Sequence, residues 1–372
     1  MTSNSLIYFD HNATTKLLLE AKEAVVEVMD APLNASSIHS LGRKAKYYKE
    51  IAKDQILSAA GLSKEDYRVI FTSSGTEANN LVMKNFYEYN IIMSPLEHLS
   101  VYKHKDYTDN ISMVQITNDG LIDLESLEML LSKAGGKVLV SVMIANNETG
   151  IIQPMDDIVK LCSKYGAYLH SDACQAIGKM DLDFAALSLD FITISAHKFG
   201  GLQGAAALIC KKKHHLVPDL VGGGQEYGLR SGSENIAAIV AMGKAASVMC
   251  AKYQHRNLAK LRDKLESELL KIASNIKIIG YNQSRLSNTS AISMPNVSAI
   301  AQMVHFDTNG FAISVGSACS SGSAKVSHVL KAMNISDEDA ENTIRVSLGI
   351  GNNEDEIMKF VQSWKEIYIN HQ

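Results

Sequence analysis

The stretch that decides the fold begins with the apolar run Val138-Leu-Val-Ser-Val-Met-Ile144. The polar turn Asn146-Asn-Glu-Thr-Gly150 follows it, and helical periodicity then covers residues 154–165. A second apolar segment, Ala167-Tyr-Leu-His170, comes next and leads into the polar pair Ser171-Asp172. A strand, a helix and a strand in this order place the two strands parallel in one sheet. The stretch therefore predicts an α/β fold.

Strand-like segments followed by polar turns recur on both sides of this unit. Tyr67-Arg-Val-Ile-Phe-Thr72 precedes Ser73-Ser-Gly-Thr76 and a helix-like segment. Phe191-Ile-Thr-Ile194 leads into Ser195-Ala-His-Lys198, and residues 205–210 form a further strand candidate. This alternation predicts a mainly parallel central sheet flanked by helices. Ligands of such sheets bind beyond the carboxyl ends of the strands, which is where the polar clusters fall.

The sequence pattern changes after about residue 233. Residues 236–249 are apolar almost all round, which predicts a buried helix. Leucines at helical spacing predict an amphipathic helix over residues 258–272, and acidic residues followed by an apolar face predict another over 354–364. We expect one large domain over residues 13–255 and a smaller α+β domain made of residues 1–12 and 256–372.

Composition excludes several classes of protein. Hydrophobic residues make up 46% of the 372, enough to bury a core, and this excludes disorder and collagen-like structure. The net charge of -4 gives no global attraction for nucleic acid. The longest apolar runs fall short of the roughly 18 residues of a membrane helix, and no secretory signal is visible. Five scattered cysteines without a pairing or metal-binding pattern favour a cytoplasmic protein.

Lys198 is the first candidate for chemistry. It follows a strand-like run and lies beside His197 and the Gly200-Gly201 turn, so a cleft can hold its amine. A desolvated lysine can form a Schiff base with a carbonyl substrate or with pyridoxal phosphate, whereas most lysines are solvated surface residues. Asp172 favours the chemical interpretation, because pyridoxal phosphate needs a carboxylate at its pyridine nitrogen. Taken alone, Asp172 fits a helix cap equally well.

An anion site is expected at Ser74-Gly-Thr-Glu77, where a strand passes into a helix. Backbone N–H groups at a helix N-terminus attract phosphate, Gly75 permits close approach, and Thr76 adds a hydroxyl. The spacing from Ser74 to Glu77 also fits a helix cap, and both interpretations can hold together. The chain contains neither a Walker A sequence nor a strand-linked GxGxxG, which disfavours nucleoside triphosphates and dinucleotides.

Cys319 differs from the other cysteines in its surroundings. It lies in Ser317-Ala-Cys-Ser-Ser-Gly-Ser323, a small and polar segment typical of a loop. A thiol with a pKa of about 8.5 is mostly protonated at neutral pH, so a nucleophilic Cys319 needs a base or a positive environment. The remaining cysteines are expected to pack in the core or to be passive: Cys162, Cys174, Cys210 and Cys250.

The sequence supports a functional role for the other titratable candidates to different degrees. His98 follows a strand-like segment and can reach the same cleft as an acid or base, although a structural histidine is the commoner case. His214 and His215 follow three lysines, a basic cluster that we expect to be solvated, and no spacing supports a metal site. Arg345 lies in an apolar stretch, so its charge needs a carboxylate from the protein or from a substrate.

Several of these segments form an ordered set along nearly the whole chain. The set comprises residues 8–15 (Tyr-Phe-Asp-His-Asn-Ala-Thr-Thr), 71–80, Glu97-His-Leu-Ser-Val101, 146–150, 195–198, Gly222-Gly-Gly-Gln-Glu226, 316–321 and Arg345-Val-Ser-Leu-Gly349. With this set the chain resembles the group I, NifS/IscS-like cysteine desulfurases of the class V aminotransferase superfamily. The resemblance implies pyridoxal-phosphate fold type I, with the cofactor on the large domain and the Cys319 loop on the smaller one.

The resemblance also implies how pyridoxal 5'-phosphate is held. Lys198 forms the covalent link to the cofactor, Asp172 pairs with the pyridine nitrogen, and Gln175 bonds the phenolic oxygen. His98 stacks on the ring and transfers protons, and Asn147 lines the cofactor. The phosphate is held by Gly75, Thr76, Ser195, His197 and, from the second subunit of a homodimer, Ser233.

The implied reaction converts L-cysteine to L-alanine. Arg345 and Asn34 bind the substrate carboxylate, and Cys319 attacks the substrate sulfur and becomes a persulfide. The persulfide supplies sulfur to an acceptor protein, such as an iron–sulfur scaffold. Two alternatives stay open: a selenocysteine lyase or other class V aminotransferase-type enzyme, and a catalytically weakened subunit that acts by binding sulfur-transfer partners.

Three sites depart from the family pattern. Asn34-Ala-Ser-Ser37 has Ala35 where a proline is usual, and Ser233 replaces a threonine but keeps the hydroxyl. After Lys198, Gly201-Leu-Gln-Gly204 replaces the usual Gly-Pro-basic-Gly turn. Leucine and glutamine loosen this turn and remove a charge near the cofactor, so we expect an effect on rate or on partner choice.

Overall fold

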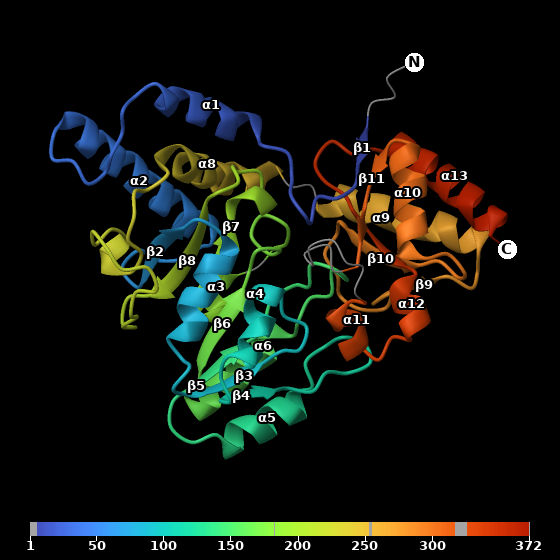
Figure 1. Cartoon of the computed structure of the whole chain (residues 1–372), viewed down its shortest axis with the longest axis horizontal. Helices are drawn as coiled ribbons and strands as arrows, with labels where there is room; N and C mark the ends of the chain where they lie inside the picture. Colours follow the sequence, from blue (N-terminus) through green and yellow to red (C-terminus); the bar gives the residue numbers. More distant parts are fainter. Residues whose placement is uncertain (1–5, 182, 253–254, 317–325, 372) are drawn as a thin grey trace.

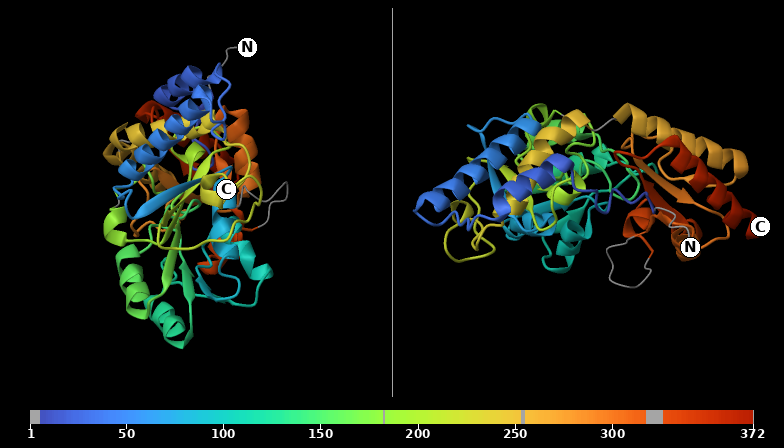
Figure 2. Two further views of the ribbon diagram at one scale, coloured as in Figure 1. Left: turned by 90° about the vertical axis from the view of Figure 1, so that its left-hand side faces the viewer. Right: turned by 90° about the horizontal axis from the view of Figure 1, so that it is seen from above.

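The computed structural model describes residues 6–181, 183–252, 255–316 and 326–371. Figure 1 shows two lobes side by side, a larger one around a long sheet and a smaller one that contains the C-terminal part of the chain. The right-hand view in Figure 2, from above, shows the same two lobes arranged one after the other along the longest axis of the molecule. None of the described helices has the length and apolarity needed to cross a membrane.

The large lobe contains a seven-stranded sheet within the described residues. Its strands, in sheet order, are β2 (Tyr67–Thr72), β8 (Ala206–Lys211), β7 (Phe191–Ser195), β6 (Tyr168–Asp172), β5 (Val138–Ser141), β3 (Asn90–Met93) and β4 (Ile111–Met113). β8 is antiparallel to both neighbours and all other pairs are parallel, which confirms the prediction of a mainly parallel sheet.

Both faces of this sheet are buried, which explains why its strands are continuous apolar runs rather than alternating ones. Along β5 and β7, Val140 and Ile192 pack into the main core, while Leu139 and Phe191 pack into a second core with α3. The run that begins at Val138 is a strand only as far as Ser141, where its neighbour β3 has ended at Met93, although the N–H groups of Val142 and Ile144 still donate to β6.

Helices cover the large sheet on both faces (Figure 1). At one end of the lobe, α1 (Leu19–Met29) and α2 (Ser40–Ala59) both pack against α8 (Ile236–Lys252). The other α-helices of this lobe are α3 (Gly75–Lys84), α4 (Leu99–Tyr102), α5 (Leu124–Lys133), α6 (Met155–Tyr165) and α7 (Phe184–Leu187). The 3-10 turns are η1 (Lys103–Asp106), η2 (Ala196–Lys198) and η3 (Glu226–Gly228). The predicted buried helix is confirmed as α8.

The smaller lobe contains a four-stranded antiparallel sheet and a two-stranded parallel pair within the described residues. The sheet is β12 (Ser314–Val315), β13 (Thr343–Ser347), β10 (Thr289–Ser293) and β9 (Lys277–Ile278), and the pair is β1 (Ile7–Tyr8) with β11 (Phe311–Ala312). The helices are α9 (His255–Ile272), α10 (Ala299–Thr308), α11 (His328–Ala332), α12 (Asp337–Glu341) and α13 (Glu354–Asn370). The predicted amphipathic helices are confirmed as α9 and α13.

An aromatic core fixes the N-terminal segment to the smaller lobe. Phe306 and Phe360 stack with ring centroids 4.4 Å apart, and Phe9 and Phe311 pack edge-on against Phe360. β1 pairs with β11 beside this core, and the chain then crosses to α1 of the large lobe (Figure 1). The predicted domain division between residues 255 and 256 lies at the start of α9 and stays a prediction.

Candidate functional site

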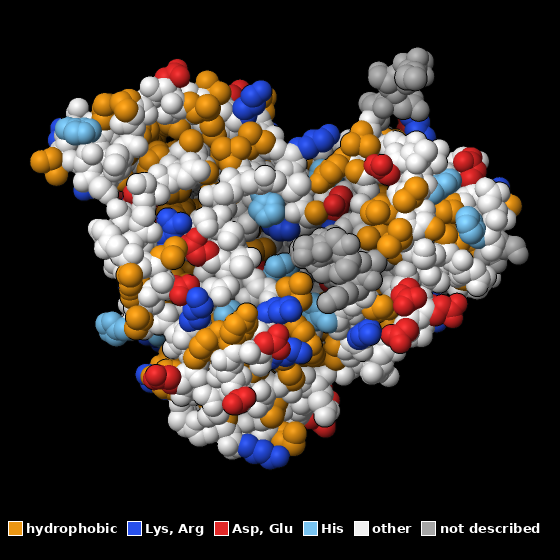
Figure 3. All heavy atoms as spheres, in the orientation of Figure 1, with side chains coloured by type: hydrophobic (Ala, Val, Ile, Leu, Met, Phe, Trp, Pro, Cys, Tyr) orange, Lys and Arg blue, Asp and Glu red, His pale blue; other side chains and the backbone are white. Residues whose placement is uncertain are grey.

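A cavity of about 780 Å³ lies beyond the carboxyl ends of β5, β6 and β7 and reaches the smaller lobe. Figure 3 shows this region as a hollow between the lobes, with histidine and basic side chains gathered beside it. Ten sequence-predicted site residues line the cavity: Gly75, Thr76, His98, Asn147, Asp172, Gln175, Ser195, His197, Lys198 and Arg345. The fold therefore brings together most of the residues that the sequence singles out.

Lys198 ends the short turn η2 that follows β7. Its Nζ donates to the main-chain oxygens of Asn12, at 2.8 Å, and Ala13, at 2.9 Å. Both acceptors are main-chain carbonyl oxygens, so these two bonds position the amine. The N-terminal segment thus holds the lysine at the floor of the cavity.

A chain of hydrogen bonds connects Asp172 with His98. Asp172 ends β6 and is 7% exposed, and its Oδ2 accepts from Nδ2 of Asn79 at 2.8 Å. The same amide donates to Oγ of Ser100, which bonds Nδ1 of His98 at 2.8 Å. Nδ1 also accepts the N–H of Ser100, which assigns the proton of the neutral imidazole to Nε2. His98 can therefore transfer a proton at Nε2.

The N-terminus of α3 and the end of β7 form an anion-binding corner. Ser74 caps the helix by accepting from the N–H of Glu77, so the capping interpretation is confirmed. The N–H groups of Gly75 and Thr76 stand before the first full turn, where they have no partner within the helix. A Cβ on Gly75 would lie 3.1 Å from Sγ of Cys174, so a larger residue here would crowd the corner.

His197 also lines this corner, and one of its ring nitrogens lacks a hydrogen bond within the described chain. Its Nδ1 is buried and has no hydrogen-bond partner among the described residues. Burial, with Lys198 and Lys179 nearby, lowers the pKa of His197 to about 4, so the ring is neutral at physiological pH. A neutral imidazole that carries its proton on Nδ1 can donate to an anion there. Together with Ser195 and the end of α3, it suits a phosphate.

Arg345 lies on β13 with its side chain 6% exposed. Its Nη2 pairs with Oδ1 of Asp10 at 2.7 Å, and its Nη1 donates to the main-chain oxygen of Asn147 at 3.0 Å. The protein carboxylate expected from the sequence is therefore Asp10. Nε of Arg345 is buried without a partner in the described chain, so one donor is left for a ligand.

Several residues that support the site are not among those that the sequence singles out. Asn12 is 1% exposed and joins the lobes, because its Nδ2 donates to Oγ1 of Thr289 and its main-chain oxygen accepts from Nε2 of Gln175. Lys179 is 2% exposed and bonds both Asn12 and Gln175. Asn12 lies inside the motif of residues 8–15. Lys179 follows the small and apolar residues Ala176-Ile-Gly178, so it could have been singled out, as Arg345 was, as a charge in an apolar stretch.

Glu97 and His328 also line the cavity. Oε1 of Glu97 accepts the N–H of Met143 at 2.6 Å, while its Oε2 is buried without a partner in the described residues. Burial raises the pKa of Glu97 well above its usual value, which favours the neutral acid. His328 bonds the main-chain oxygen of Glu97 at 2.9 Å and stacks on Tyr102.

Three predicted site residues are not part of the described cavity. Asn34 is exposed, and its Oδ1 accepts the N–H of Ser36 instead. Ser233 is exposed on the connection before α8. Cys319 lies outside the described residues. The roles of these three residues stay predictions.

Two smaller expectations need correction or refinement. His214 is not solvated, because it is half-buried and its Nε2 bonds Asp190 at 2.7 Å; His215 is exposed as expected. Cys174 lines the cavity rather than the core, although burial raises the pKa of its thiol and keeps it protonated. Cys162 and Cys210 are buried as expected, and Cys250 carries no described side chain. Gln203, one of the family departures, lines the cavity.

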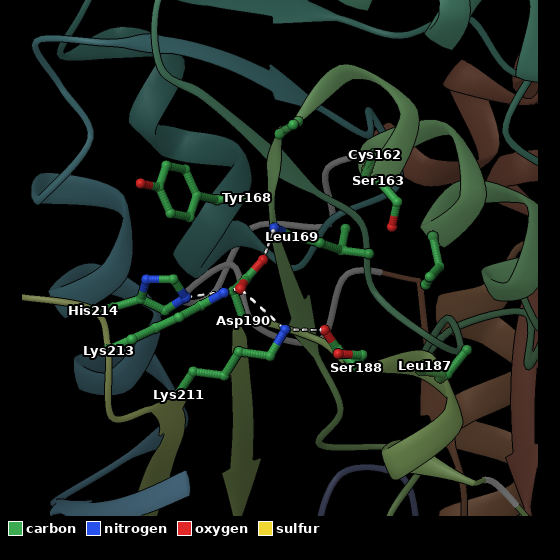
Figure 4. Close-up of a pocket in the computed structure, with 13 residues that line it drawn as sticks. Cys162, Ser163, Tyr168, Leu169, Leu187, Ser188, Asp190, Lys211, Lys213 and His214 are labelled. Atoms are coloured by element: carbon green, nitrogen blue, oxygen red, sulfur yellow. Dashed lines mark hydrogen bonds and ion pairs between the residues drawn. The ribbon is translucent and has the colours of Figure 1, made fainter. Parts of the chain in front are cut away.

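A second cavity, of about 490 Å³, lies at the other end of the large sheet's strands, beside the amino ends of β6 and β7. Figure 4 shows Asp190 at its centre, with Lys211 and His214 turned toward the carboxylate. The remaining oxygen of Asp190 accepts the N–H of Leu169. The carboxylate at the centre of this cavity is therefore already paired with Lys211 and hydrogen-bonded by His214.

No cluster of three or more histidine, cysteine or acidic side chains suited to a metal ion occurs in the described part of the chain. Amine, amide, imidazole and guanidinium donors line the main cavity together with three acidic side chains, Asp172, Glu97 and Glu148, of which burial favours the neutral acid for Glu97. Such a set suits an organic anion rather than a metal cation.

Comparison with known proteins gives one consistent family. The family model of class-V aminotransferases matches residues 7–360. A cysteine desulfurase IscS of Dictyoglomus turgidum is 35% identical over 92% of this chain and 90% of its own length. A cysteine desulfurase of Trichormus variabilis is 36% identical over 96% and 92%. The X-ray structure of a NifS-like protein from Rickettsia africae is 42% identical, covers 98% of this chain and 99% of its own, and superposes with a TM-score of 0.93.

Proposed function

The chain belongs to the aminotransferase class-V family, and on this premise we propose that it is a cysteine desulfurase that uses pyridoxal 5'-phosphate. It converts L-cysteine to L-alanine and passes the sulfur to its own Cys319. The observation that carries the proposal is the single cavity in which Lys198, Asp172 and Arg345 meet. An amine, a carboxylate and a carboxylate-binding guanidinium are the three groups that this chemistry on an amino acid needs.

The donor set of the cavity fits the cofactor. The end of α3, Ser195 and the unpartnered Nδ1 of His197 suit its phosphate, Lys198 suits its carbonyl carbon, and Asp172 suits its ring nitrogen. When bound, pyridoxal phosphate supplies an electron sink that accepts the electron pair released at the substrate carbon. Asn147 and Gln175 complete the lining on the side of the N-terminal segment.

Three residues of the cavity have a defined task in this proposal. Asp172 holds a proton at the pyridine nitrogen, since Asn79 and the N–H of Cys174 already fix its two oxygens. Arg345 orients the substrate through its carboxylate. His98 moves a proton at Nε2, on the side of the ring away from its bonds to Ser100.

The sulfur step requires the thiolate of Cys319. It attacks the sulfur of the bound substrate cysteine, a sulfur–sulfur bond forms, and the carbon–sulfur bond breaks. The electron pair of the broken bond stays on the carbon side, which a proton then converts to alanine. An acceptor protein, for which an iron–sulfur scaffold is our first candidate, later takes the persulfide sulfur.

The test compares Cys319→Ser with Cys210→Ser, a matched change at a buried cysteine of β8. We expect Cys319→Ser to lose alanine formation from cysteine plus reductant while it keeps the absorbance of the bound cofactor. Cys210→Ser should keep both. Turnover by Cys319→Ser at the wild-type rate would contradict the proposal, as would a purified protein that binds no pyridoxal phosphate.

The proposal includes a homodimer in which Ser233 reaches the phosphate of the partner subunit. Exposed apolar side chains support such a surface, because Leu19, Val26 and Met29 project from α1 at 59–67% exposure. Sedimentation should give a dimer for the wild type and a monomer for Val26→Glu/Met29→Glu, with weaker cofactor binding in the monomer. A wild-type monomer with full cofactor affinity would contradict it. The scattered cysteines support action in the cytoplasm.

A further inference from the structure

Lys179 is among the largest fully buried side chains, at 2% exposure, although it does not line the cavity. It lies in the turn after β6, four residues beyond Gln175. Its Nζ donates to Oε1 of Gln175 at 2.6 Å and to Oδ1 of Asn12 at 3.2 Å. No carboxylate of the described residues forms an ion pair with it.

Burial of an amine without a carboxylate partner is unfavourable for stability. Burial and the nearby Lys198 and Arg345 lower the pKa of Lys179, so its surroundings oppose its charge. An apolar side chain of the same length would fill this space at less cost. An amine at such a position therefore points to a task other than packing.

The task follows from the direction of the hydrogen bonds. A carboxamide presents an oxygen at one end and an N–H donor at the other, and the two ends have nearly the same shape. A lysine amine has N–H groups to donate in either protonation state. Here Lys179 donates to the side-chain oxygen of Gln175. Nε2 of Gln175 therefore faces the main-chain oxygen of Asn12, at 3.0 Å, on the cavity side.

Lys179 orients Asn12 in the same way. Oδ1 of Asn12 accepts from Lys179 and from Nδ2 of Asn288, so its Nδ2 is directed to Thr289 and Asn147. The main-chain oxygen of Asn12 in turn accepts from Lys198. One buried amine thus donates to the side-chain oxygens of both Gln175 and Asn12.

We propose that Lys179 is a positioning residue that fixes Gln175 with its N–H end toward the phenolic oxygen of the bound cofactor. The proposal rests on the assignment of Gln175 to the cofactor. Without Lys179, the Gln175 carboxamide loses one of the two contacts that distinguish its ends, and only the bond from its Nε2 to the main-chain oxygen of Asn12 remains. The carboxamide can then turn either its N–H end or its oxygen toward the cofactor.

The experiment uses the full-length protein and a double-mutant cycle of Lys179→Met and Gln175→Leu, both similar in size to the native side chains. Three quantities are measured: the dissociation constant for pyridoxal phosphate, the pH titration of the bound cofactor's absorbance, and the urea midpoint of the cofactor-free protein. We expect Lys179→Met to weaken cofactor binding by about 3- to 10-fold, as for one lost hydrogen bond, and to shift the absorbance titration. The urea midpoint should not fall.

The cycle separates the possible outcomes. Lys179→Met should have no further effect on cofactor affinity or absorbance in the Gln175→Leu background, because the residue acts through that amide. An equal effect in both backgrounds, or no effect in either, overturns the proposal for Lys179. A Gln175→Leu protein with unchanged absorbance overturns the assignment of Gln175 instead. If Lys179→Met does not fold, Lys179→Gln, which keeps an N–H donor, should restore folding and most of the affinity; failure to do so also overturns the proposal.

Discussion

Arg345→Lys is the change that tests the substrate end of the cavity most directly. Lysine keeps the positive charge but offers a single donor atom in place of the planar fork of arginine. In the native protein, Nη2 is committed to Asp10 and Nη1 to Asn147. A lysine amine at this position is expected to pair with Asp10, so little remains for a substrate carboxylate.

The magnitude follows from the number of charged hydrogen bonds that the substrate loses. One such bond contributes about 1.5–3 kcal/mol, which corresponds to about a 10- to 150-fold change in binding. We expect the KM for L-cysteine to rise by this factor, with a smaller change in kcat, since Arg345 binds the carboxylate rather than the reacting atoms. Alanine formation at varied cysteine concentration measures both constants.

Arg285→Lys is the matched control. Arg285 forms a buried, bidentate pair with Glu266 in the smaller lobe, with side-chain exposures of 4% and 2%. It does not line the cavity. Both variants weaken a buried arginine–carboxylate pair, so both should lower the urea midpoint, but only Arg345→Lys should raise KM. A folded Arg345→Lys protein with KM within twofold of the wild type would refute the reasoning.

Two further variants test groups that the sequence analysis overlooks. Because burial raises the pKa of Glu97 above 4.5, the folded state binds its proton more tightly than the unfolded chain. Stability should therefore fall by up to about 1.4 kcal/mol per pH unit as pH rises from 4.5 toward the folded pKa. Glu97→Gln should remove this loss in urea titrations at several pH values, and equal pH dependence of both proteins would contradict it. Asn79→Leu removes the two donors that link Asp172 to Ser100, and we expect kcat to fall by about tenfold with the pH–rate profile displaced; an unchanged profile would show that the link has no catalytic effect.

Local pattern was sufficient for the main elements of the fold. Continuous apolar runs bounded by turns predicted β2, β6 and β7, because strands buried on both faces need apolar residues at every position. The reversed direction of β8 was not predictable, since an antiparallel and a parallel buried strand carry the same residues. The end of β5 at Ser141 depends on where the neighbouring strand leaves the ladder, which local pattern does not contain.

The site was predictable where a residue carries its own chemical reason. Lys198 and Asp172 follow predicted strands, and Arg345 is a charge in an apolar run, so each could be named before its neighbours were known. Asn79 and Lys179 could not, because an amide or an amine acquires its task only from the groups beside it. Their partners lie 93 and 167 residues away in the chain, at Asp172 and Asn12.

The sequence by itself determined the α/β class, the family and the reactive groups, because those depend on periodicity and on residue types in a fixed order. Only the tertiary structure decided which groups pair with one another. It paired Arg345 with Asp10, linked Asp172 to His98 through Asn79, and placed Lys179 behind the cavity. Hydrogen-bond partners depend on distances of a few ångströms between distant segments, and those distances exist only once the segment around Asn12 has packed against both lobes.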